Sequence, residues 1–415
     1  NEKEERLAIL VSSGKSEQLL GVPAITSSSG EAQSTAVVDA LIEWGLTTDI
    51  CAGCFDTTIR NSERFGGACV LIEKKLDKKI LHLACRHHIF ELTLEAAFVV
   101  ALGNSKNPEI LPLFAKFGNA WPEIDKDKYS PAGRQILRKF PCDSDEMIIF
   151  CKFQLKEFQP RDDYREPLEL SIIYLGGLPD REISFRKPGA ISKCRWMARA
   201  IYSIKIFFLN SLSLKRNELV IFATYITVWF QSPSAVSAPR VDLNYLKILK
   251  KNSKPGTLWE AALTKMLRRW YLSSDLSPLS FDDDAVSVET KREMVSALLH
   301  EDGEEDPPKR GVLTSKLIHD DLDQSSFVTK QSHFFFKALK LSVDVLLQND
   351  PATWSNNAVY CRDQAVVREL RVVNDVAERG VKLITENANI ITTNEKEKQD
   401  LLLVVAQHRK DNPHM

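Results

Sequence analysis

An aspartate at the end of a short apolar run is the first residue of this chain that could do chemistry. Asp56 follows the apolar residues of DICAGCFDTT (residues 49–58), which predict a buried central strand. Ligands and metal ions gather at the carboxyl edge of a parallel sheet, so Asp56 could hold a divalent metal ion for phosphoryl transfer. Asp is also a favoured N-cap residue, and Asp56 could instead cap the helix that follows.

A second group of possible ligands lies in CRHH (residues 85–88). Cys85 and His88 have the C-x-x-H spacing that can supply half of a zinc site. Cys51 and Cys54 form a C-x-x-C, but strand alternation would send their side chains to opposite faces. We therefore do not expect a closed zinc site. The alternative is that Cys85 and His88 pack and hydrogen-bond locally where a strand meets a helix.

Three segments mix basic and aromatic residues, a composition that suits phosphate contact with base stacking. They are CRWMARAIYSIK (residues 194–205), YLKILKK (245–251) and KMLRRWYL (265–272). Amphipathic helices of any soluble protein look similar, so each segment alone is ambiguous. Three of them in one part of the chain favour DNA, with Lys250, Lys251, Arg268 and Arg269 as candidate contacts. The acidic run FDDD (281–284) could bind a cation, but its turn signals favour a solvated acidic turn.

The elements that must position these residues alternate between strand and helix in the first hundred residues. Strands are predicted at 7–12, around 50–56 and at 80–84, and a loop is predicted after the first. Helices are predicted at 31–44, with Gly45 as C-cap, around 68–75 and at 90–102. This order implies a mainly parallel sheet covered by helices. From about residue 105 to 365 amphipathic helical patterns dominate, and another helix is predicted around 372–385.

Charge and composition limit the functional classes. The chain has 55 Lys and Arg against 56 Asp and Glu, a net charge of -1, so any DNA contact must come from local patches. Eight cysteines without a signal-peptide pattern suit a reducing compartment, and we expect a nuclear or cytoplasmic location. The longest apolar run, residues 219–230, is about half the ~20 residues that a bilayer needs, so it predicts a buried helix and no membrane span.

Four segments, in this order, resemble hAT-superfamily DNA transposases of a divergent, transposon-derived animal branch. CFDTTIRNSERFGGACVLIEKKL and LACRHHIFEL resemble the second-Asp and C-x-x-H regions of that family. CRWMARAIYSIK is similar to the Arg-Trp segment at the entry of the helical insertion. VVNDVAERGVKLITENANIITTNEKEKQDLLL resembles the C-terminal segment around the Ser/Ala-Glu-Arg core. Together these segments span about residues 7 to 410.

The resemblance implies roles for individual residues. Asp56 corresponds to the second catalytic Asp and Glu378 to the catalytic Glu, which would hold Mg²⁺ or Mn²⁺ if the protein is active. Cys85 and His88 would be the structural C-x-x-H pair. Trp196 would stack on DNA bases and Arg195 would contact a phosphate.

The implied fold is α/β, a partial RNase H-like mixed sheet interrupted by a large all-α insertion. We expect residues 1–110 to form the partial core, 111–365 the helical insertion and 366–415 a C-terminal segment that completes the core. The family's first catalytic Asp and the first strands have no counterpart before Asp56. Either upstream residues were removed from this chain, or the protein is a broken or domesticated copy.

The expected function is therefore that of a transposase-derived DNA-binding protein. Its ancestral activity is metal-dependent DNA strand cleavage and transfer, which we expect to be catalytically incomplete in this chain. DNA and further copies of the chain, in a homo-oligomer, are the expected partners. The alternative is a non-enzymatic scaffold for protein interaction or self-association.

Overall fold

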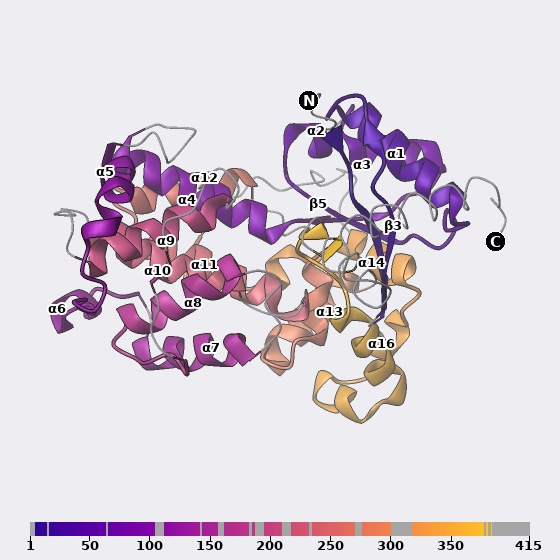
Figure 1. Cartoon of the computed structure of the whole chain (residues 1–415). Coiled ribbons are helices and arrows are strands. Elements are labelled where there is room, and N and C mark those ends of the chain that lie inside the picture. Colours follow the sequence, from indigo (N-terminus) through magenta and orange to yellow (C-terminus); the bar gives the residue numbers. More distant parts are fainter. Residues whose placement is uncertain are drawn as a thin grey trace. The chain divides into compact units, whose positions relative to one another are not determined.

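The computed structural model describes most of the chain, which divides into two compact units (Figure 1). The first unit comprises residues 1–85, 333–345 and 356–415, and the second comprises 86–332 and 346–355. Described are residues 5–14, 16–63, 65–103, 112–141, 143–156, 162–181, 185–186, 195–209, 217–231, 235–269, 276–299, 318–376, 379–380 and 383; within these, side chains are not described at 134–135, 162–164, 195–198, 217, 228–231 and 269.

The first unit holds all the strands that the structure describes, so the chain is mixed α/β. They are β1 (Glu5–Arg6), β2 (Ile9–Ser13), β3 (Ser16–Gly21), β4 (Ala24–Ile25), β5 (Ala52–Phe55) and β6 (Leu81–Ala84). β1 pairs with β4 and β2 with β3, both antiparallel, whereas β5 and β6 are parallel. The sequence predicted a mainly parallel sheet, and among the described strands only β5 and β6 pair in that way. The first predicted strand, β2, instead pairs with its neighbour β3 in a separate antiparallel sheet.

A hairpin replaces the loop that the sequence predicted after the first strand. Ser13 pairs with Ser16, and Gly14 between them has a φ of 57°, in the left-handed region that a two-residue hairpin turn requires. β3 begins with polar residues whose side chains are largely exposed, which is why they resemble a loop in the sequence. Leu20 at its far end is buried with Ile9 and Leu41, so the hairpin packs on α1 (Gly30–Glu43).

Local signals account for α1 and for the crossover between the parallel strands. Ser29 caps α1 by accepting a hydrogen bond from the Ala32 amide, and Gly45 just after the helix has a φ of 65°. α2 (Ile59–Ser62) and α3 (Ala68–Leu76) connect β5 to β6. A Cβ at Gly30 would lie 2.3 Å from the Gly66 carbonyl oxygen, so only glycine allows α1 to begin so close to this crossover.

Helices and 3-10 turns form the second unit, and no strand occurs among its described residues. Its α-helices are α4 (Arg86–Leu102), α5 (Pro112–Ala120), α6 (Arg134–Leu137), α7 (Ser144–Lys156), α8 (Asp162–Tyr174), α9 (Arg195–Phe208), α10 (Asn217–Gln231), α11 (Ala238–Asn252), α12 (Leu258–Arg269) and α13 (Val288–Leu299). The apolar run at 219–230 lies in α10, and its residues 219–226 are fully buried, as the sequence predicted.

The division between the units falls earlier than the sequence suggested. Helix α4 belongs with the second unit because it packs on α9, α10 and α12, so the change comes at residues 85 and 86 rather than near 110. Helices α14 (His333–Leu339) and α16 (Ala358–Arg368) lie in the first unit, so the chain returns to it before residue 366. The short helix α15 (Val343–Gln348) spans the second division.

A fully buried ion pair fixes the start of α4. The Arg86 guanidinium donates from Nε to Oδ2 of Asp242 at 2.8 Å and from Nη2 to Oδ1 at 2.5 Å. The two side chains are 0% and 1% exposed, and Arg86 also lies over the ring of Phe90, 5.4 Å from its centroid. Two charges can leave water at such a site only if they satisfy each other's hydrogen bonds.

We predict that Asp242→Ala destabilises the second unit by about 3–5 kcal/mol, because it leaves the Arg86 charge buried without its partner. Replacing both members by apolar residues, Arg86→Met with Asp242→Leu, should recover most of that loss. Denaturant unfolding followed by circular dichroism measures both effects. Asp350→Ala is the matched control, since Asp350 pairs with Arg292 at 2.9 Å on the exposed surface. A single variant no less stable than this control would contradict the prediction.

Candidate functional site

Asp56 lies where the sequence placed it, directly after β5. Thr58 occupies the N-cap position of the helix that follows, but its side chain makes no capping hydrogen bond, so both readings of Asp56 stay open. The Asp56 backbone carbonyl accepts a hydrogen bond from Asn61 Nδ2 at 3.2 Å, which ties the end of β5 to α2. Glu378, the proposed second carboxylate, lies outside the described residues, so its distance to Asp56 stays a prediction.

Described residues on both sides of Glu378 contact the strands of the first unit. Arg379 Nε donates to Asp375 Oδ1 at 2.6 Å, and Arg379 Nη1 also binds Glu17 on β3. Arg371 Nη2 lies 2.9 Å from the same Glu17 carboxylate. Two arginines of the C-terminal segment thus bind one glutamate of the β2–β3 hairpin, which holds these two parts of the first unit together. This role of Glu17 could not be predicted from the sequence, because Glu17 falls in the stretch predicted as a loop.

Cys54 and Cys85 lie beside this charged cluster. Burial raises the pKa of the Cys54 thiol well above its usual value, and the nearby Cys85 and Asp375 raise it further, while Arg379 opposes them. Cys85 is fully buried, and its Sγ accepts a hydrogen bond from the Asn374 amide at 3.1 Å. A thiol with a raised pKa carries little thiolate at neutral pH, so Cys54 is a weak nucleophile and metal ligand.

The residues described around Asp56 do not make a metal site. Asp375 is neutralised by Arg379, and Glu17 by two arginines. Within the part of the chain that the structure describes, no three His, Cys, Asp or Glu side chains gather as metal ligands would. His88 lies on α4 with its Nδ1 3.6 Å from Glu91 Oε2, a local pairing. We therefore derive no catalytic step through Mg²⁺, Mn²⁺ or zinc.

We predict that thiol alkylation separates the cysteines by burial. Cys361 is exposed and should react with iodoacetamide at pH 8 before the buried Cys69 and Cys85, which should stay protected until the protein unfolds. Peptide mass spectrometry over time gives the rate at each residue. Cys361→Ser is the control and should remove the fast phase alone. Alkylation of Cys85 as rapid as that of Cys361 would show that burial does not protect it.

The second candidate site is a pair of helices that we call the basic hairpin, defined as α11, the connection 253–257 and α12. Between residues 247 and 269 it carries seven Lys and Arg but a single acid, Glu260. Lys250, Lys251, Lys254 and Arg268 are exposed. Leu246, Leu249, Leu263 and Met266 on the opposite faces are buried, which turns the charges outward.

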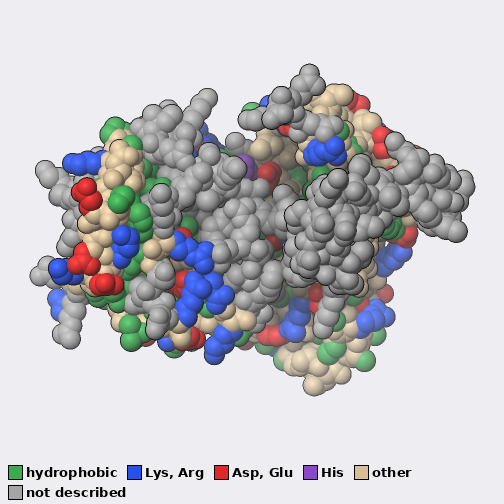
Figure 2. Space-filling view, viewed as in Figure 1, with side chains coloured by type: hydrophobic (Ala, Val, Ile, Leu, Met, Phe, Trp, Pro, Cys, Tyr) green, Lys and Arg blue, Asp and Glu red, His purple; other side chains and the backbone are tan. Residues whose placement is uncertain are grey.

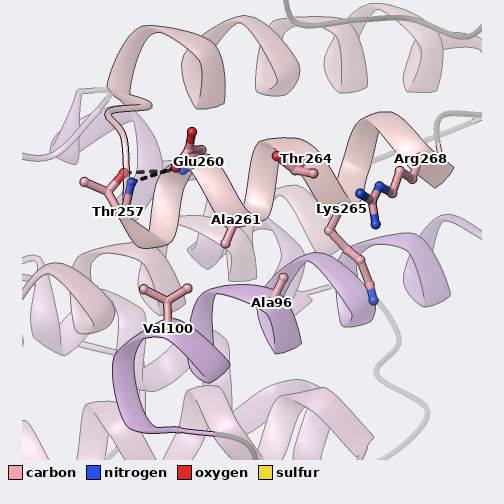
Figure 3. A pocket seen from close by; sticks show the side chains of 9 residues that line it. Ala96, Val100, Thr257, Glu260, Ala261, Thr264, Lys265 and Arg268 are labelled. Atoms are coloured by element: carbon pink, nitrogen blue, oxygen red, sulfur yellow. Dashed lines mark hydrogen bonds between the residues drawn. The ribbon is translucent and has the colours of Figure 1, made fainter.

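A groove of about 350 Å³ runs along α12 where this helix packs on α4 (Figure 3). Ala96 and Val100 of α4 form one wall, and Ala261 and Thr264 of α12 lie on the other. Lys265 and Arg268 stand at the same end of the groove. At the other end, the Glu260 carboxylate accepts a hydrogen bond from the Gly256 amide at 2.7 Å, so the single acid of residues 247–269 is engaged at the turn between α11 and α12.

The other predicted DNA contacts fall into two groups: residues whose side chains the structure does not describe, and one lysine that is buried. Arg195 and Trp196 begin α9 and Arg269 ends α12, but their side chains lie outside the described ones. Further along α9, Lys205 is 1% exposed, pairs with Glu166 and donates to the Arg186 carbonyl at 2.9 Å. Its segment therefore does not present this lysine to phosphate.

Two further expectations drawn from the sequence are wrong because the side chains concerned are buried. Tyr245 has no exposed surface, so it cannot stack on a base. The acidic run at 281–284 is not a solvated turn, because Asp282 and Asp283 are buried and Arg240 Nε donates to Asp283 at 2.7 Å. Burial lowers the pKa of the neighbouring Lys291, although these acids raise it.

Figure 2 shows both acidic and basic side chains among the described residues of the face that it presents, in keeping with a net charge of -1. Among the described helices, none has both the length and the apolar character needed to cross a bilayer.

Comparison with known proteins gives no relative for this chain. No family model, no curated protein and no solved structure matches it. The function must therefore be argued from the residues and their placement.

Proposed function

We propose that this chain is a transposase-derived protein that binds duplex DNA through the basic hairpin. The observation that carries the proposal is the local charge: seven basic residues against one acid in residues 247–269 of a chain whose net charge is -1. Non-specific affinity for DNA comes from such a patch, because each phosphate neutralised by Lys or Arg releases a condensed counterion.

The dimensions of the hairpin support contact with several phosphates. α12 has 12 residues and is therefore about 18 Å long, which corresponds to roughly five nucleotides of rise along one strand. Lys250, Lys251 and Lys254 lie near its first turn, and Lys265 and Arg268 lie in its last turns. Five such contacts would give a slope of log K against log salt of about -4.5.

The transposase origin rests on the resemblance of the four segments, and a nuclear location forms part of the proposal. Asp56 and Glu378 remain the candidates for the ancestral metal-binding carboxylates. The described carboxylates of Glu17 and Asp375 are neutralised by arginines, so the proposal is for DNA binding and includes no cleavage. The groove between α4 and α12 would lie along the DNA backbone, with Thr264 beside the two basic residues at its end.

We predict that Lys265→Ala with Arg268→Ala weakens DNA binding about tenfold near 0.1 M salt and makes the salt slope shallower by about two. Lys250→Ala with Lys251→Ala should act similarly, because a phosphate contact carries no sequence information. Fluorescence anisotropy of a labelled duplex, titrated at several salt concentrations, measures both quantities.

The control is Lys79→Ala with Lys337→Ala, two exposed lysines of the first unit, which should leave affinity and slope unchanged. Equal losses in the control and hairpin variants would place the contact elsewhere. A parent chain without salt-dependent affinity would contradict the proposal and favour the non-enzymatic scaffold.

A further inference from the structure

Helix α7 presents apolar side chains on two opposite faces. Its inner face carries Met147 and Cys151, which are buried, and Cys151 packs against Leu168 of α8. On its outer face Ile149 is 69% and Phe153 58% exposed. These two residues are four apart, so their side chains are neighbours on the helix surface. In Figure 1, α7 lies at the margin of the second unit.

Charged residues stand at both ends of this apolar pair. Asp145 and Glu146 are exposed in the first turn of α7, and Lys156 is exposed in its last turn. At 100° per residue these side chains share one stripe with Ile149 and Phe153. We call this the α7 stripe, with Asp145, Glu146, Ile149, Phe153 and Lys156 as its members.

The order of residues in the α7 stripe is self-complementary. Glu146 and Lys156 lie five residues before and after position 151, and Ile149 and Phe153 lie two residues before and after it. Two copies of α7 that pack antiparallel about this position would therefore place Ile149 against Phe153 twice and Glu146 against Lys156 twice. A two-fold axis uses the same patch on both copies. If one residue of the first copy contacts a second residue of its partner, the same contact therefore occurs again with the copies exchanged.

We propose that the α7 stripe is the contact through which two copies of this chain associate as an antiparallel helix pair. The apolar pair supplies the affinity and the charged ends set the orientation. A parallel pair would place acid against acid and lysine against lysine, which costs free energy at an interface.

A neighbouring turn enlarges the apolar surface. Gly177 lies against Ile148 so closely that an added Cβ would be 3.2 Å from that side chain, and Asp180 pairs with Lys152 at 3.3 Å. Both partners lie on the flank of α7 next to the stripe. Leu178 between them is 68% exposed, so the turn holds a third large apolar side chain beside this helix.

The expected association is weak and reversible. One pair of helices buries less than the roughly 1,200 Å² typical of a stable interface, so we expect dimers at about 100 µM and monomers at about 1 µM. The contact involves neither α11 nor α12, and therefore does not depend on DNA binding by the basic hairpin.

Sedimentation equilibrium of the full chain across that concentration range tests the proposal. Phe153→Glu should abolish association, since it would bury a carboxylate in the apolar centre. Glu146→Lys alone should weaken association about tenfold, because it faces lysine with lysine twice. Glu146→Lys combined with Lys156→Glu reverses both charges and should restore the parent's affinity.

Leu299→Glu is the matched control, because Leu299 is 61% exposed on α13 and should not affect association. Far-UV circular dichroism and thermal unfolding of each variant separate lost association from lost folding. A parent that stays monomeric at 100 µM, an associating Phe153→Glu variant, or a double charge reversal no better than the single one would each overturn the proposal.

Discussion

The second unit depends on the ion pair between Arg86 and Asp242. Apolar contacts between its helices are non-directional and tolerate sliding, whereas a guanidinium buried with a carboxylate is satisfied in one geometry alone. The first residue of α4 is thereby held on α11, 156 positions away in the chain. From that attachment α4 goes on to pack along α12, beside the groove that ends at Lys265 and Arg268.

In the first unit a similar constraint acts at a half-buried site. Glu17 binds Arg371 and Arg379. These contacts join the β2–β3 hairpin to residues more than 350 positions later in the chain. Arg379 also pairs with Asp375, so Glu17 and Asp375 are both neutralised by arginine. The cluster thus stabilises the packing of the C-terminal segment, and its described members are not free to neutralise a metal ion.

The basic segments show how packing separates residues of one type. Lys205 and Lys250 both occur in amphipathic helices with aromatic neighbours. Lys205 of α9 lies over the ring of Trp121 and pairs with Glu166 of α8, so its charge is matched inside the second unit. Lys250 lies in the last turn of α11 and is exposed, so its charge remains in water. A long basic side chain can serve either purpose, so composition alone does not distinguish a DNA contact from a core ion pair.

The local structure can be predicted from the sequence wherever local signals are strong. Ser29 and Gly45 delimit α1, the short apolar runs form β5 and β6, and the apolar stretch at 219–230 forms a buried helix. The polar start of β3 hid a strand, because its residues face solvent on one side of a hairpin. Only the tertiary structure decided which charges are paired, exposed or neutralised. Periodicity shows that a face is buried or exposed, but the element that covers it comes from a distant part of the chain.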